Sequence, residues 1–260
     1  MSIQSFYEHV ILRDILAFIL PGGISLAGIQ MIMHALGIER WEKTLPFLSN
    51  LDPLLQIILL LLISFLVGHV WDMVYRVRFQ TNPQFQRIET IQKILIGNPA
   101  SESKSVDNHI ANQICSSVGQ FLNIDWKKTP IEKWIESGKA FDLSVLLSYW
   151  IEEEDPKIFG NEIARPLIQS HLLHVCGMAF YFFSGCILLG EIMCWFGINP
   201  LRESDPLTLW ALIVISFLFG WALIRQGMHK RDIIVDHVFR VFYVIWRKRV
   251  LEHKAGLKKG

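Results

Sequence analysis

The stretch LLQIILLLLISFLVG, residues 54–68, decides the fold class, because only Gln56 and Ser64 interrupt its apolar side chains. A helix needs roughly 20 residues to cross the hydrocarbon core of a bilayer. The sequence therefore predicts an all-α polytopic membrane protein with four transmembrane helices. The alternative is a set of helices buried in a large soluble core. The four apolar runs cover about residues 15–38, 53–71, 172–198 and 207–225.

Composition places the chain outside the usual range of soluble proteins. Of its 260 residues, 52% are hydrophobic and only 19% are charged, and the mean hydropathy is +0.34. Soluble domains carry more charge than this. The cysteines form no set of spaced pairs, so neither a disulfide framework nor a zinc ribbon is expected.

Lysine and arginine predict how the chain is oriented, because they accumulate on the cytoplasmic side of a membrane. With four spans, residues 39–52 and 199–206 form short loops on one side. These loops hold three of the 25 basic residues, and the other 22 lie in the N-terminus, the middle segment and the tail. We therefore expect an integral membrane protein whose two termini and middle segment are cytoplasmic.

The spans divide the chain into four parts. Residues 1–72 comprise an amphipathic helix at the membrane surface and a first transmembrane hairpin. Residues 73–170 form a small helical cytoplasmic domain, inserted between the second and third spans. Residues 171–225 form a second hairpin, and residues 226–260 form a basic cytoplasmic helix or tail.

The two predicted hairpins resemble each other. The second span contains DPL from Asp52 and then ISFLVG, and the fourth contains DPL from Asp205 and then ISFLFG. An aspartate caps a helix start while proline fits its first turn, which explains DPL but not the second match. Either the hairpins arose by duplication, as parallel repeats, or two leucine-rich spans match by accident.

Small residues and one proline lie inside the first span, in FILPGGISLAG at residues 18–28. Small side chains let helix backbones approach closely, and neighbouring helices can satisfy the backbone groups that a proline frees. Two alternatives follow: a bend in a tightly packed helix, or the hinge of a gate. The expected packing or hinge residues are Pro21, Gly22, Gly23, Ala27, Gly28, Gly185 and Gly190.

Polar side chains within spans are costly and are therefore candidates for function. Glu191 is the only carboxylate well inside a predicted span, and His34 lies at a similar depth. Gln30, His34, Gln56 and Glu191 are expected to form an intramembrane polar cluster. This cluster either lines a water-filled path or holds helices together by hydrogen bonds.

The middle segment carries helical rather than strand periodicity. Ile91 and Leu95 recur at helical spacing, as do Ile110, Ile114 and Val118. Its charge is balanced, with 11 basic and 12 acidic residues, so a nucleic-acid surface is not indicated. A soluble cytoplasmic protein or a small signalling ligand is the expected partner of residues 73–170.

The tail differs in charge, with ten basic and three acidic residues from Arg225 onward. Basic and apolar residues together suit a helix on anionic lipid, or a handle for a partner. Arg247, Lys248 and Arg249 are the expected contacts. An ordinary cytoplasmic flank is the alternative.

The sequence predicts no enzyme, cofactor or metal site. His171 and His174 lie in the same leaflet as His69 and Asp72, so these four residues could be drawn as a metal site. Histidines at membrane boundaries more often face headgroups or carbonyl groups. The motifs of zinc proteases, serine hydrolases and phosphate-binding loops are absent from the sequence.

Three functions follow from this organisation. The first is an oligomeric, gated pore that is controlled through the helical domain. The second is a non-conducting membrane anchor or sensor that recruits a soluble partner, and the third is a small transporter subunit. The architecture is similar to that of membrane effectors in bacterial anti-phage defence, which implies a bacterial cytoplasmic membrane; no motif carries this likeness.

Overall fold

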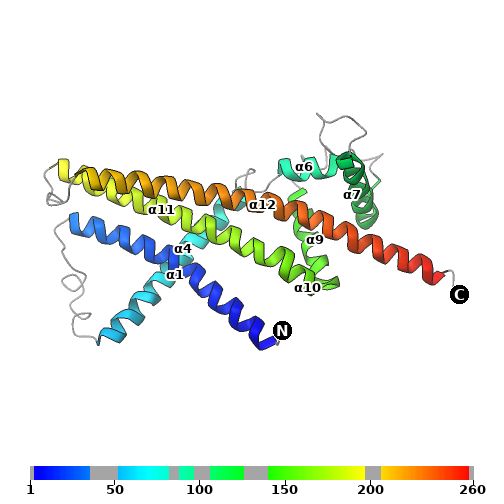
Figure 1. Ribbon diagram of the computed structural model, residues 1–260, viewed down its shortest axis with the longest axis horizontal. Coiled ribbons are helices and arrows are strands. Elements are labelled where there is room, and N and C mark those ends of the chain that lie inside the picture. Colours follow the sequence, from blue (N-terminus) through cyan, green and yellow to red (C-terminus); the bar gives the residue numbers. More distant parts are fainter. Residues whose placement is uncertain are drawn as a thin grey trace. The chain divides into compact units, whose positions relative to one another are not determined.

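The computed structural model describes residues 3–35, 52–81, 88–96, 106–125, 140–196 and 206–257. Within these ranges every regular element is a helix, which confirms the predicted all-α class (Figure 1). The helices are α1 (Ile3–Ala35), α4 (Pro53–Thr81), α6 (Ile88–Ile96), α7 (Val106–Leu122), α9 (Ala140–Glu154), α10 (Pro156–Ile158), the π-helical η2 (Phe159–Ala164), α11 (Arg165–Trp195) and α12 (Pro206–Leu257).

Three of the described helical segments are long and apolar enough to cross a membrane. They are Pro53–Arg78, Pro156–Met193 and Leu207–His253. The predicted first span corresponds to a shorter apolar segment, Ala17–Met33, within α1. The described residues therefore support an integral membrane protein with three candidate spans.

Helix α1 runs through Pro21 without interruption. Proline removes one backbone donor from the helix. One turn later, the Ser25 hydroxyl donates to the carbonyl oxygen of Pro21 at 2.8 Å. The predicted surface helix and the apolar segment that follows it therefore form one continuous element in the structure.

The Asp-Pro pairs begin helices, as the sequence predicts. The amide of Leu54 donates to Oδ1 of Asp52 at 2.8 Å, which caps the first turn of α4. At the start of α10, the amide of Ile158 donates to Oδ1 of Asp155 at 3.0 Å. Each aspartate thus satisfies a donor that has no partner within its helix.

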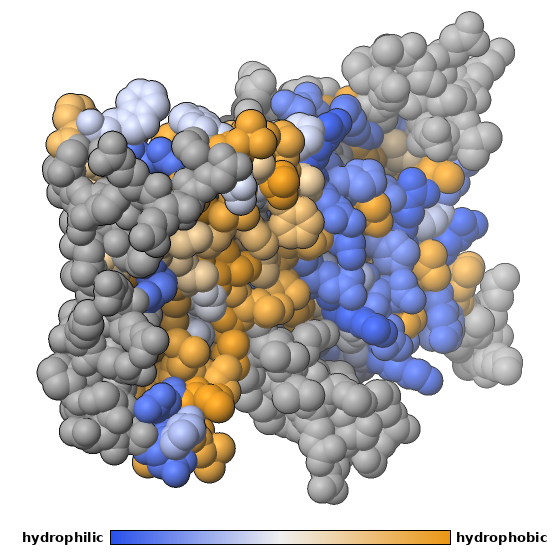
Figure 2. Space-filling model, turned by 60° about the vertical axis from the view of Figure 1, so that its left-hand side comes forward, coloured by the Kyte–Doolittle hydropathy of each residue, from blue (hydrophilic) through white to orange (hydrophobic). Residues whose placement is uncertain are grey.

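The chain divides into two compact units. The first, here called the membrane unit, comprises Met1–Arg78 and His171–Gly227. The second, here called the helical unit, comprises Phe79–Ser170 and Met228–Gly260. Figure 2 shows mainly apolar side chains on the visible face of the membrane unit and mainly hydrophilic ones on that of the helical unit.

In the membrane unit, α11 and α12 lie side by side and antiparallel (Figure 1). Ring pairs join them at 4.9 Å, between Tyr181 and Phe217 and between Phe180 and Phe219. Towards the other end of this pair, Ile187 is buried in a cluster with Leu209. The second predicted hairpin is thus packed along its described length.

The helical unit has its own core. The periodic residues Ile91, Leu95, Ile114 and Val118 are all buried in it, as their spacing predicts. Buried side chains of α9 complete one side, and Phe121 packs against the cluster from α7.

The tail provides much of this core. Helix α12 continues to Leu257, and Phe239 and Phe242 are fully buried among residues of α7 and α9. The Phe242 ring lies 5.2 Å from the rings of Phe121 and Trp150. Phe239 and Phe242 thus face the protein, whereas other apolar residues of the tail, such as Val244 and Leu251, stay exposed.

Candidate functional site

Helices α1 and α4 cross at two glycines. A Cβ atom at Gly22 would lie 1.7 Å from the carbonyl oxygen of Ser64, and one at Gly68 would lie 1.9 Å from that of Phe18. No side chain fits at such distances, so the two backbones touch here. This is the close approach that small residues permit between helices in a membrane.

Helices α11 and α12 also approach each other closely at two glycines. A Cβ atom at Gly177 would lie 2.8 Å from the carbonyl oxygen of Gly220, and one at Gly220 would lie 2.9 Å from that of Gly177. Gly28 places α1 against α11, since its Cβ would lie 3.1 Å from Cα of Phe183. Glycine contacts therefore link α1 to both α4 and α11.

The predicted packing residues divide into two groups. Gly22 and Gly28 make close contacts, whereas Gly23 has only the Ser64 hydroxyl within 4 Å, at 3.9 Å. Ala27 and Gly185 are exposed, and a Cβ at Gly185 would meet nothing within 4 Å. Gly190 is buried on α11, and Pro21 is buried within α1.

Sequence reasoning missed three glycines, Gly68, Gly177 and Gly220. Two of them carried a usable signal, because Gly68 and Gly220 are the last residues of ISFLVG and ISFLFG. In the structure both have the same role, a close contact with a preceding helix, α1 for Gly68 and α11 for Gly220. Gly177 stands outside any repeated motif.

Trp71 of α4 contacts two other helices of the membrane unit. Its indole nitrogen donates to the Ser25 hydroxyl of α1 at 2.6 Å. Its ring meets that of Phe182 in α11, edge on, at 5.6 Å. Ser25 is buried, so this hydrogen bond satisfies two polar groups where water does not reach.

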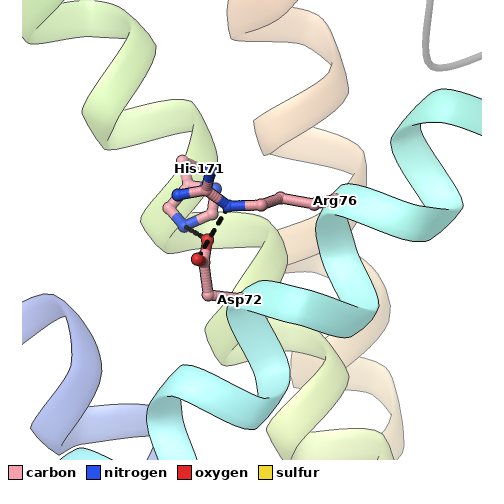
Figure 3. A network of polar contacts seen from close by, with 3 residues as sticks. All are labelled: Asp72, Arg76 and His171. Carbon is pink, nitrogen blue, oxygen red and sulfur yellow. Dashed lines mark hydrogen bonds and ion pairs between the residues drawn. The ribbon is translucent and has the colours of Figure 1, made fainter.

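A buried carboxylate links α4 to α11 (Figure 3). Oδ1 of Asp72 lies 3.0 Å from Nε2 of His171, and Nε of Arg76 donates to Oδ2 at 2.8 Å. Asp72 is 6% exposed, and the Tyr75 ring lies 4.5 Å from that of His171. A buried carboxylate is costly unless it is paired. Arg76 pairs with Asp72 within α4, and His171 links Asp72 to α11.

The residues that allow a metal site to be drawn have other roles. Asp72 accepts from His171 and Arg76, and the ring of the buried His174 lies 5.4 Å from that of Tyr75. Among the residues that the structure describes, no group of three or more His, Cys, Asp or Glu side chains could hold a metal ion.

The predicted intramembrane polar residues lie on three helices. Glu191 is buried on α11, one turn beyond the buried Ile187. Gln30 lies on α1, and its Oε1 atom is buried with no hydrogen-bond partner in the described part of the chain. Gln56 is half-buried on α4, and the side chain of His34 lies outside the described residues. Their grouping into one cluster stays a prediction.

The predicted basic contacts lie on α12 within the helical unit. Arg247 donates to the hydroxyl of Tyr243 at 2.7 Å, and Arg249 forms an ion pair with Glu154 of α9. Lys248 is exposed. Arg249 therefore supports the packing of α12 on α9, while Arg247 faces a groove beside α7.

No known protein family, curated protein or solved structure matches this chain.

Proposed function

We propose that the chain forms an oligomeric, gated pore in a bacterial membrane, controlled through the helical unit. The observation that carries the proposal is the burial of Glu191 and of the Gln30 amide oxygen within the membrane unit. Polar groups at membrane depth are costly, and an inert anchor does not need them. Water in a path beside these groups would satisfy them.

The proposed topology has α1 as a fourth span. Its apolar segment Ala17–Met33 is packed against α4 and α11 through Gly22 and Gly28. The basic residues favour cytoplasmic termini and a cytoplasmic helical unit. At the corresponding end of α12, the Arg225 guanidinium lies 5.2 Å from the Trp221 ring, a pairing suited to the interface.

The exposed surface of the spans supports contact with lipid and with further copies. Only 11% of the apolar window of Pro53–Arg78 is buried within the chain, and only 22% of that of Leu207–His253. Large apolar side chains such as Leu62, Leu66 and Phe217 are among the exposed ones. An oligomer would cover part of this surface and leave the rest to lipid.

A flux assay with a paired variant tests the proposal. The purified protein is reconstituted into liposomes of phosphatidylethanolamine and phosphatidylglycerol, and ion flux and subunit number are measured on one preparation. Glu191→Gln keeps the size of the side chain and replaces its carboxyl group by an amide, so flux or ion selectivity should change while assembly persists. Leu189→Ala, at an exposed position of α11, is the control and should conduct like the wild type.

Two results would contradict the proposal. One is wild-type protein that assembles but never conducts, which would favour a membrane anchor that recruits a partner. The other is a Glu191→Gln variant that loses assembly alone, which would make Glu191 a structural hydrogen-bonding residue.

A further inference from the structure

A groove of about 430 Å³, lined by both polar and apolar side chains, lies between α7 and α12 in the helical unit. Small-molecule sites commonly enclose about 300–1,000 Å³. One wall is a face of α7 and the other is the C-terminal part of α12. The side chains that define its chemistry are His109, Gln113, Ser116, Gln120, Tyr243 and Arg247.

The α7 wall is polar without being charged. Residues 108–124 contain no Asp, Glu, Lys or Arg. His109, Gln113, Ser116 and Gln120 recur at helical spacing and so lie on one side of α7. The solvated face of a helix ordinarily carries charged residues, whereas amides and hydroxyls are the groups that orient a small ligand.

A chain of hydrogen bonds links Arg247, Tyr243, Gln113 and His109. The Arg247 guanidinium donates to the Tyr243 hydroxyl at 2.7 Å, and this hydroxyl donates to Oε1 of Gln113 at 2.6 Å. Nε2 of Gln113 lies 2.8 Å from Nε2 of His109. The lining is thus organised before any ligand arrives.

The groove carries a positive charge. Arg247 is the one formally charged side chain among the described lining residues, and none of these is a carboxylate. Arg247 is exposed and has further N–H donors beyond the one that Tyr243 accepts. Trp246 also lines the groove, and its indole N–H has no acceptor in the described part of the chain.

We propose that this groove binds a small organic anion through Arg247, a molecule with one phosphate or carboxylate group and several hydrogen-bonding groups. The anionic group pairs with the guanidinium, and the remaining polar groups meet the amides and hydroxyls of α7. The proposed function is the basis for regarding this molecule as the controlling signal. Binding itself does not depend on conduction.

Calorimetric titration of the purified full-length protein in detergent micelles tests the site. The probes are adenosine 5′-monophosphate, glucose 6-phosphate and glutamate, with adenosine and glucose as uncharged counterparts. At least one anionic probe should bind with a Kd below about 1 mM, and inorganic phosphate should compete with a bound phosphate ester. An uncharged counterpart should bind much more weakly.

A matched pair of variants assigns the binding to the groove. Arg247→Met should weaken the binding of the tightest-binding probe by about 10- to 100-fold, which is the loss of affinity expected for one charge-assisted hydrogen bond. Lys248→Met removes an exposed cation from the adjacent position, outside the groove lining, and should leave the Kd unchanged. Tyr243→Phe removes the hydroxyl that orients Arg247 and Gln113 and should weaken binding to a smaller extent.

Three results would overturn the inference: no binding by any anionic probe, equal binding of the uncharged counterparts, or equal effects of the two cation variants. Failure of the proposed pore is a separate result. If the protein binds the probe with the expected dependence on Arg247 but does not conduct ions, the proposed binding site is supported and the proposed pore is contradicted.

Discussion

Gly22 and Gly68 decide how closely α1 and α4 approach. Each would place a Cβ less than 2 Å from a backbone carbonyl oxygen of the other helix, at 1.7 and 1.9 Å. Neither contact can be relieved by rotating a side chain, because the opposing atom belongs to the backbone. Replacing either glycine must therefore move a helix.

We expect Gly22→Ala to destabilise the membrane unit, because the added methyl group separates α1 from α4. Overpacking of this kind costs about 1–3 kcal/mol. Unfolding in sodium dodecyl sulfate, followed by far-UV circular dichroism, should show a lower midpoint than for the wild type. Gly185→Ala, at a site with nothing within 4 Å, is the control and should retain the wild-type midpoint. Equal midpoints for both variants would refute the close crossing.

The sequence predicted some of these contact residues and not others. Gly22 and Gly28 stand in a conspicuous group of small residues, and both pack closely. Ala27 and Gly185 look equivalent in sequence but face outward. The difference depends on which side of each helix meets a neighbour, and composition does not contain that information. Gly68 and Gly220 did carry such a signal, because they end the two matching motifs ISFLVG and ISFLFG.

Helix α12 shows the same limit for a whole element. Its apolar and basic C-terminal part has the composition of a surface-bound helix, yet its apolar side forms the core of the helical unit. The residues that bury it belong to α6, α7 and α9, which are distant from it in the sequence. The sequence signals were mixed: no proline follows Pro206, but Gly227 after Arg225 has the pattern of a helix end, and α12 continues through it.

We expect Phe242→Ala to unfold or loosen the helical unit. Phe242 is fully buried among aromatic rings, and truncating such a residue costs about 3–5 kcal/mol. Limited proteolysis of the full chain should cut α7 and α9 faster than in the wild type. Val244→Ala, at a residue that is 64% exposed, should leave the cleavage rate unchanged. The opposite result would be a Phe242→Ala variant that is cleaved at the wild-type rate but binds anionic liposomes less than the wild type does. It would favour the alternative in which the tail rests on lipid.

For the molecule as a whole, the all-α class and the membrane-spanning character follow from apolar runs alone. The periodicity of the middle segment also predicted its buried residues correctly. The sequence could not predict which distant segments contact each other, such as α1 with α4 and α12 with α9. Those pairings depend on complementary surfaces that form only when both segments are folded.

The proposed pore depends on how the chain crosses the membrane. The open point is whether α1 is a fourth span. With α1 as a fourth span, the two termini lie on the same side; with three spans, they lie on opposite sides. Epitope tags are placed before residue 1 and after residue 260, and each is probed in intact and in permeabilised bacterial cells. Both tags should become accessible only after the inner membrane is permeabilised. An N-terminal tag that is reachable from the periplasm, with a protected C-terminal tag, would contradict the four-span arrangement.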